Sequence, residues 1–491
     1  MAGALKTFGI GAGMTVVSAG LVGICNYFSR RELALTLERG DFGLLYSAIG
    51  IFTITVAIAD FGLNNTLTMR LSRYSSEGAY PECRRIFVNV LLFKVLLAVL
   101  LTTGALTAAD WICTDYFRYP GGTRIFRIGA VYCISYQFLL FFVAVFCGLK
   151  AFVSMNLAQL SFYLPSAVLL MAVPGGTLLR VGMFIFGGLV LFPVAYALLR
   201  RRAEINSSGE PHDGVGWGQL LAVSKWFMMG NVFLTMLGFA DIVIIGRLAG
   251  VASAGVYNAA VAVGMIVTPL TLAANLSLTV IAEHWKKGDV VGITDLVNCA
   301  INVWSALFLC GGLFFLLFAE EVITILFSSD FVAAAPALAV LGPAVLLNVL
   351  LLFLYGVLNG MDQFLTANSI LVVGVVIDIL CGAILVPGWG IIGGAAGTLA
   401  GYGVSALLCY AILSRRLSGI KLSLFPLSVG VFVYIGGWLC RHASLGIRCG
   451  VLALTVLFLG GWVKSVLTAL WGVTGGNCEK QLKPGQEDDA V

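Results

Sequence analysis

Long apolar segments recur from one end of this sequence to the other. In windows of about 19 residues they predict about fourteen spans, because roughly 20 residues of helix cross a bilayer. Within lipid the backbone must satisfy its own hydrogen bonds, and segments of this length do so as helices. The composition agrees, since 60% of the 491 residues are hydrophobic and only 11% are charged. We therefore expect an all-α integral membrane protein.

The first apolar segment runs from about Gly9 to Phe28. It has the length of a spanning helix, whereas the apolar core of a signal peptide has about 7–15 residues. No small-residue cleavage site is clearly separated from it. We expect it to be retained as the first spanning helix.

Basic residues gather in alternate loops between the apolar segments. The even-numbered loops hold clusters such as Arg200 to Arg202 and the pair Arg415 and Arg416, whereas the odd-numbered loops are poorer in basic residues. By the positive-inside rule, the even-numbered loops and both termini should face the cytoplasm. The net charge of +5 therefore reflects topology and does not indicate a nucleic-acid partner.

A polar linker from Arg200 to Gly218 divides the segments into groups of six, six and two. Across it, Gly148–Asn156 aligns with Gly360–Asn368, and the same offset sets Gly43 against Gly255. A repeat with an even number of spans gives two bundles related by a pseudo-two-fold axis along the membrane normal. The expected parts are an N-terminal six-helix bundle (1–199), a cytoplasmic linker (200–218), a C-terminal six-helix bundle (219–414), two extra transmembrane helices (415–470) and a cytoplasmic tail (471–491).

Ionisable side chains inside a span cost several kcal/mol, so each one calls for a partner or a function. Lys94 lies deep in the third predicted span and Asp378 near the middle of the eleventh, and for both we favour a cavity-lining role. Lys225 and Asp241 share the seventh span but are too far apart to pair locally. Lys225 and Arg247 could instead extend to the membrane boundaries.

Polar residues also mark the ends of the first two spans. Arg30 and Arg31 end the first, and Asp60, Asn64 and Asn65 end the second. These residues could be interfacial anchors and a polar helix terminus, or they could have a role in transport. Near the outer ends, aromatic residues such as Phe42, Tyr46 and Tyr257 could contact sugar rings, or could belong to the aromatic belt of a membrane protein.

Motifs of soluble enzymes are missing from the sequence. The twelve cysteines include no C-x-x-C pair, and His212, His284 and His442 are far apart, so we expect no metal site. A P-loop is also missing, which argues against ATP hydrolysis by this chain. We expect no cofactor and no enzymatic activity, and uphill transport would need an ion gradient, a membrane potential or a downstream sink.

The run from Asp60 to Leu67, Asp-Phe-Gly-Leu-Asn-Asn-Thr-Leu, resembles the second-helix signature of bacterial polysaccharide flippases. These belong to the superfamily that also holds the multidrug and toxic-compound extruders and the lipid II flippases. The resemblance extends, in order, over Arg39–Gly43, Asp241–Arg247, Ala254–Ala260 and Asn359–Asp362.

This resemblance implies a substrate and a direction. The substrate would be an oligosaccharide repeat unit on undecaprenyl diphosphate, moved from the cytoplasmic to the periplasmic leaflet of a bacterial inner membrane by alternating access. The product would serve a surface polysaccharide such as O-antigen, lipopolysaccharide or capsule. Besides membrane lipids, a polysaccharide polymerase and a chain-length regulator are the expected partners.

A lipid diphosphate needs cations and hydrogen-bond donors on its path. The candidates for substrate binding are Arg30, Arg31, Asn64, Asn65, Lys94, Lys225 and Arg247. The carboxylates that could couple transport to a proton or another cation are Asp60, Asp241 and Asp378.

Two other functions compete with the flippase. An extruder of cationic drugs or toxins would resemble this fold equally, but it favours an acidic cavity, whereas the buried charges here are mixed. A membrane glycan polymerase or glycosyltransferase usually carries a large extracytoplasmic loop. The longest outer loop expected here, about Ala109 to Arg127, is short.

Overall fold

The structure is a computed structural model that describes residues 2–206, 217–267, 281–417, 419–420, 435–437, 439–441, 443–461 and 464. Within these ranges it is helical and contains no strand, and ten helices are long and apolar enough to cross a membrane. The helices α1, α11 and Leu445–Gly461 occupy further expected spans. The expected span near Phe425 lies outside the described residues. The predicted all-α membrane fold is confirmed.

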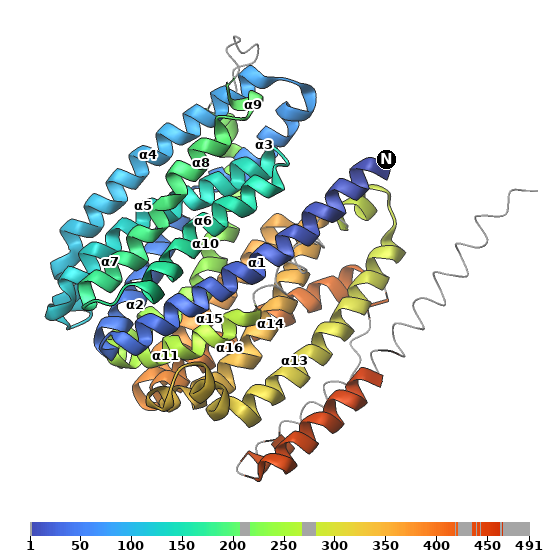
Figure 1. Ribbon diagram of the computed structural model, residues 1–491. Helices are drawn as coiled ribbons and strands as arrows, with labels where there is room; N and C mark the ends of the chain where they lie inside the picture. The colour runs from blue at the N-terminus through green and yellow to red at the C-terminus, as the bar shows by residue number, and fades with distance from the viewer. Residues whose placement is uncertain are drawn as a thin grey trace, which may run out of the picture.

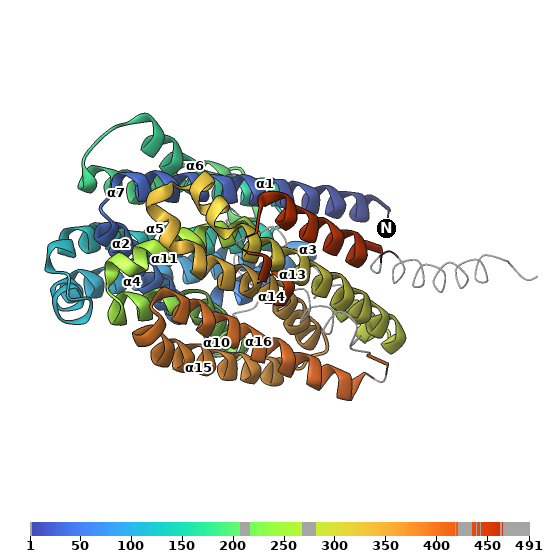
Figure 2. The same cartoon turned by 90° about the horizontal axis from the view of Figure 1, so that it is seen from below.

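Two groups of helices lie side by side in Figure 1, and their long helices run in roughly one direction in Figures 1 and 2. The N-terminal bundle contains α1 (Ala2–Thr36), α2 (Arg39–Ala59), α3 (Leu63–Glu77), α4 (Tyr80–Trp111), α5 (Thr123–Gly148), α6 (Phe152–Ala172), α7 (Thr177–Gly187) and α8 (Leu191–Leu199). The C-terminal bundle contains α10 (Trp217–Leu248), α11 (Val251–Gly264), α13 (Val290–Leu326), α14 (Ala335–Gly360), α15 (Phe364–Trp389) and α16 (Ile391–Arg416).

Shorter elements complete these spans. They are the π-helix Ile112–Tyr116, the 3₁₀ helices Pro120–Gly122, Gly188–Val190, Met265–Val267 and Ser329–Ala334, and α9 (Ala203–Asn206), which packs against α4. The first helix is longer than its apolar segment predicts. It continues past Arg30 and Arg31 to Thr36, and both arginines hydrogen-bond to the other bundle.

The Phe-Gly pair of the second-helix signature separates the span α2 from the polar helix α3. Phe61 and Gly62 both have positive φ, 50° and 70°. A Cβ atom on Gly62 would overlap the carbonyl oxygen of Ser224 and lie 2.6 Å from the backbone nitrogen of Met228. Glycine is therefore required here both for the bend and for the close approach of α10.

The internal repeat predicted from the sequence is present in the structure. The turn between α5 and α6 has Lys150 at φ 55°, and the turn between α14 and α15 has Asp362 at φ 60°. The Lys150 N–H donates to the carbonyl of Cys147 (3.0 Å), and the Asp362 N–H donates to that of Asn359 (3.1 Å). The neighbouring backbone hydrogen bonds repeat at the same offset. Equivalent residues thus form equivalent turns in the two bundles.

The second pair of aligned glycines lies where the bundles meet. A Cβ on Gly43 would overlap the carbonyl oxygen of Val251, and a Cβ on Gly255 would overlap that of Arg39. Arg39 and Val251 are themselves separated by the repeat offset. The crossing of α2 and α11 is therefore symmetric, and it is the place where only glycine allows the two backbones to touch.

The helix Leu445–Gly461 is held on α13 at a kink. Phe318 has non-helical angles (φ −123°, ψ 16°) inside α13. Arg448 donates to the carbonyl of Leu317 (2.7 Å), pairs with Glu321 (2.5 Å) and lies 5.4 Å from the ring centre of Phe318. The arginine therefore supplies a hydrogen bond to a carbonyl at the kink. Inside a membrane no water is present to supply it.

Candidate functional site

Three arginines tie the bundles together at the predicted outer end, where α1 ends and α2 begins. They are Arg31, which donates to the carbonyl of Leu326 (2.9 Å), Arg39, which donates to that of Asp330 (2.9 Å), and Arg247, which donates to that of Tyr116 (2.8 Å). Arg31 and Arg247 are predicted substrate-binding residues. In this conformation their guanidinium groups hydrogen-bond to backbone of the opposite bundle.

Tyr119 holds the start of α2 at the same end. Its hydroxyl donates to Asp41 Oδ1 at 3.0 Å. Burial and the hydrogen bond to this carboxylate raise the pKa of Tyr119 to about 12, so the hydroxyl stays a neutral donor at physiological pH. Gly40 lies against this ring, and a Cβ there would come within 2.9 Å of the hydroxyl oxygen.

Arg30 precedes Arg31 on α1 and is only 5% exposed. Its Nη1 donates to Asn258 Oδ1 on the other bundle (2.9 Å), and its guanidinium carbon lies 4.6 Å from the ring centre of Tyr46. Its Nε makes a longer contact with Asn26 Oδ1 (3.4 Å). None of the carboxylates in the described parts of the chain pairs with it. Arg30 is thus a buried cation without a counterion, which is costly inside a membrane.

Two neutral groups beside Arg30 lack hydrogen-bond partners among the described residues. They are the hydroxyl of Tyr46 and the Nδ2 amide of Asn258, and both are buried. A buried donor without an acceptor costs free energy. The cation and these donors therefore form a place where a polar, negatively charged group would be stabilised.

Lys94 and Asp60 form an ion pair inside the N-terminal bundle. Both side chains are almost fully buried, and Lys94 Nζ contacts Asp60 Oδ1. The other carboxylate oxygen of Asp60 accepts from the backbone N–H of Asn64 (3.4 Å), and Gln137 Nε2 donates to the carbonyl of Lys94 (3.2 Å). The structure thus joins two predicted site residues to each other, at the break between α2 and α3.

The remaining predicted residues of the inner half lie apart from this pair. Asn65 makes a long contact with Asn231 of α10 (3.5 Å), and the buried side-chain oxygen of Asn64 has no partner among the described residues. Lys225 is exposed, with its ammonium 5.2 Å from the ring centre of Trp226. These residues do not form one cluster with Arg30.

Two carboxylates are buried in the C-terminal bundle. Asp241 Oδ2 accepts from the hydroxyls of Tyr257 (2.5 Å) and Thr398 (3.1 Å), and its Oδ1 accepts from the N–H of Ile242 (2.7 Å). Asp378 packs against Gly397 and Gly401, which flank Thr398 on α16, and its Oδ2 has no partner among the described residues. Neither forms an ion pair within the part of the chain that the structure describes.

Sequence reasoning missed part of this acidic site. Thr398 stands in a glycine-rich helix and nothing in its surroundings marks it as a ligand. Tyr257 was considered for sugar contact, whereas the structure places its hydroxyl on Asp241. These contacts join α10, α11 and α16, so no local spacing along the chain could reveal them.

Comparison with known sequences shows the family to which the chain belongs. The polysaccharide biosynthesis protein family matches residues 10–280. The probable low-salt glycan biosynthesis flippase Agl15 of Haloferax volcanii is 22% identical, and the match covers 93% of both chains. The uncharacterized membrane protein MJ1068 of Methanocaldococcus jannaschii is also 22% identical, over 83% of this chain and 85% of that protein.

Two solved structures share the fold over most of their length. The inward-facing conformation of a multidrug resistance MATE family transporter of the MOP superfamily gives a TM-score of 0.67 at 16% identity, covering 83% of this chain and 99% of that chain. The lipid II flippase MurJ in an inward closed conformation gives 0.61 at 11% identity, covering 92% and 99%. The chain therefore belongs to the polysaccharide biosynthesis protein family and has the fold of the MOP superfamily transporters.

Proposed function

We propose that this protein flips an undecaprenyl-diphosphate-linked oligosaccharide repeat unit from the cytoplasmic to the periplasmic leaflet of a bacterial inner membrane. Both termini would lie in the cytoplasm, and the two bundles would alternate in access around their interface. A polymerase and a chain-length regulator would use the exported unit. The observation that carries the proposal is Arg30, a buried cation between the bundles that has no acidic partner among the described residues.

The surroundings of Arg30 suit a phosphate group. A guanidinium presents planar donors that match phosphate oxygens, and it keeps its charge when buried. The free donors of Tyr46 and Asn258 supply further hydrogen bonds without adding charge. An anion bound there would compete with Asn258 Oδ1 for the Arg30 guanidinium, so loading the site would weaken a contact between the bundles.

Arg30→Gln should abolish export of the glycan, because glutamine keeps some hydrogen bonding but removes the charge. Loss of a buried charged partner costs about 2 kcal/mol or more, which is about a thirtyfold loss of affinity. The measurement is surface glycan and lipid-linked repeat units in a deletion strain complemented with the variant. Repeat units should accumulate on the cytoplasmic leaflet.

Arg201→Gln is the matched control, since Arg201 is exposed at the start of the linker. It should restore surface glycan fully. Full restoration by Arg30→Gln would contradict the role proposed for Arg30, and unchanged surface glycan after deletion of the gene would contradict the flippase itself.

We also propose that Asp241 and Asp378 bind the coupling ion, a proton or a monovalent cation. Two buried carboxylates without a cation repel each other, and both binding of a cation and protonation remove that cost. The hydroxyls of Tyr257 and Thr398 would complete the oxygen ligands of a cation. This acidic site lies in the bundle opposite Arg30 and Tyr46, so the anionic substrate and the ion would use different bundles.

Asp378→Asn should lower uptake of the ion about tenfold or more, since it removes one of the two charges that attract it. The measurement is calorimetric titration of the purified protein with sodium chloride against choline chloride, together with proton uptake by a pH dye. Asp362→Asn is the control, because Asp362 is exposed and asparagine tolerates its left-handed φ. Unchanged sodium and proton uptake in Asp378→Asn would overturn the assignment.

An extruder of cationic compounds is the second candidate. The observation in its favour is the buried acidic pair, which would attract an organic cation. Deletion of the gene would then leave surface glycan unchanged and raise sensitivity to cationic compounds. Loss of glycan with unchanged sensitivity would exclude it.

A further inference from the structure

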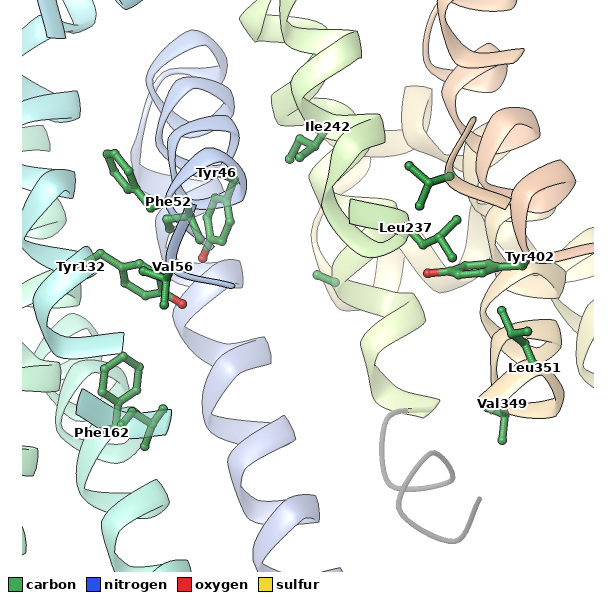
Figure 3. Packing of buried hydrophobic residues seen from close by; sticks show 14 of the residues in the cluster. Tyr46, Phe52, Val56, Tyr132, Phe162, Leu237, Ile242, Val349, Leu351 and Tyr402 are labelled. Atoms are coloured by element: carbon green, nitrogen blue, oxygen red, sulfur yellow. The ribbon is translucent and has the colours of Figure 1, made fainter. Parts of the chain in front are cut away.

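A cluster of aromatic rings lies beside Arg30 in the N-terminal bundle. Tyr132 and Tyr136 of α5 are stacked, with ring centres 5.1 Å apart and planes at 12°. Phe162 of α6 meets Tyr132 edge-on at 6.2 Å, and Tyr163 meets Phe162 edge-on at 4.8 Å. Figure 3 shows Tyr132 and Phe162 beside α2 together with Tyr46, on the opposite side of α10 from Tyr402. The rings therefore form one aromatic wall on the N-terminal side.

Arg30 lies at this wall. Its guanidinium covers the ring of Tyr46. The helix α2, which carries Tyr46, packs against α5, which carries Tyr132, and α1, which carries Arg30, packs along α6, which carries Tyr163. Tyr136 and Tyr163 are half-buried, so part of each side chain is open to an adjacent group. The buried Tyr46 hydroxyl and Asn258 amide, both without partners in the described chain, lie next to the same guanidinium.

The tyrosines of α5 lie together in one part of that helix. The aromatic residues further along α5, Phe138, Phe141, Phe142 and Phe146, are all phenylalanine and fill the core. Tyr132 and Tyr136 precede these phenylalanines on α5 and lie nearer the predicted outer end, where Arg30 also lies. A hydroxyl inside a membrane protein is costly without a partner, so tyrosines gathered around a cation indicate a polar ligand.

A sugar fits this combination of groups. One face of a pyranose ring presents C–H groups that pack on an aromatic ring, and its hydroxyls exchange hydrogen bonds with phenol hydroxyls. In a lipid-linked glycan the first sugar is bonded directly to the diphosphate. A diphosphate held at Arg30 would therefore place that sugar within reach of the wall.

We propose that Tyr132, Tyr136 and Tyr163 form a subsite for the sugar next to the diphosphate. The inference rests on the proposed function, because Arg30 must first hold the diphosphate. The subsite adds selection for the glycan. A bare lipid diphosphate would contact Arg30, Tyr46 and Asn258, whereas a glycan-bearing one would also contact Tyr132, Tyr136 and Tyr163. The protein would then recognise this sugar before the rest of the repeat unit.

The test compares two lipids on the purified full-length protein in detergent. One is undecaprenyl diphosphate, and the other is the lipid-linked repeat unit extracted from the deletion strain. We expect the wild-type protein to bind the glycan-bearing lipid about tenfold more tightly than the bare lipid. The double variant Tyr136→Leu with Tyr163→Leu should bring this ratio close to one and leave affinity for the bare lipid unchanged. Arg30→Gln should weaken the binding of both lipids by the same factor.

Two further variants keep the test decisive. The double variant Tyr136→Phe with Tyr163→Phe retains the rings and the packing, so it should fold. It should still lower the ratio of the affinity for the glycan-bearing lipid to that for the bare lipid. Tyr196→Leu, at a residue that is 68% exposed on α8, is the matched control and should keep the full ratio. A ratio of one in the wild type, or an unchanged ratio in both double variants, would overturn the subsite. If neither lipid binds the wild type, the proposed function fails as well.

Discussion

Lys94→Met is expected to destabilise the protein by about 3–5 kcal/mol, because it leaves a buried carboxylate without its counterion. Lys94 is fully buried and contacts Asp60, which is itself buried at the end of α2. Besides Lys94, the donor to the Asp60 carboxylate among the described residues is the backbone N–H of Asn64 at 3.4 Å, so Asp60 depends on Lys94 for a counterion. The measurement is thermal unfolding of the purified protein in detergent, together with its yield in the membrane.

The double variant Asp60→Asn with Lys94→Met should recover most of this loss, since it removes both charges together. Lys225→Met serves as the control, because this lysine is exposed and forms no ion pair with the described residues. If Lys94→Met kept full stability and lost export, the pair would act in transport and the structural account would be wrong. If the double variant restored both stability and export, the Lys94–Asp60 pair would have a structural role and no role in transport.

Gly43→Ala is expected to disrupt the closed contact between α2 and α11. The added Cβ would overlap the carbonyl oxygen of Val251 and lie 2.6 Å from the backbone nitrogen of Gly255. Backbone atoms cannot rotate away as a side chain can, so the helices must separate. Overpacking of this kind costs about 1–3 kcal/mol. Such a cost shifts an equilibrium between two conformations by about 5- to 150-fold.

Hydrogen exchange of residues 39–48 and 251–258 measures this shift directly, and complementation measures its effect on glycan export. Both segments should exchange faster, and export should fall because the bundles no longer close at their predicted outer side. Gly104→Ala is the matched control, since no atom lies near a Cβ at that position of α4. Equal exchange in Gly43→Ala and the wild type would contradict the role of this crossing.

The fold could be predicted largely from local features of the chain. Apolar segments of spanning length must form helices, because a helix satisfies its own backbone hydrogen bonds inside a bilayer. The alignment of Gly148–Asn156 with Gly360–Asn368 predicts two bundles. The structure confirms both, down to the equivalent turns at Lys150 and Asp362. Each of these signals is a property of consecutive residues, which is why the sequence carries it.

The candidate site could be predicted only in part. Counting ionisable residues in apolar segments identifies Lys94, Asp241 and Asp378 as exceptional, because each would be costly in lipid. It does not show that Lys94 is neutralised by Asp60, whereas the two aspartates pair with no cation in the part of the chain that the structure describes. That difference depends on which helices are neighbours.

The sequence by itself determined the membrane environment, the repeated bundles and the short list of buried charges. Only the tertiary structure decided how these charges are distributed: Arg30 faces Asn258 across the interface, and Asp241 meets Tyr257 and Thr398. The physical reason is that hydropathy and helix periodicity act over neighbouring residues along the chain. A charge is neutralised by whatever lies a few ångströms away in space, and in a bundle those partners come from helices far apart in sequence.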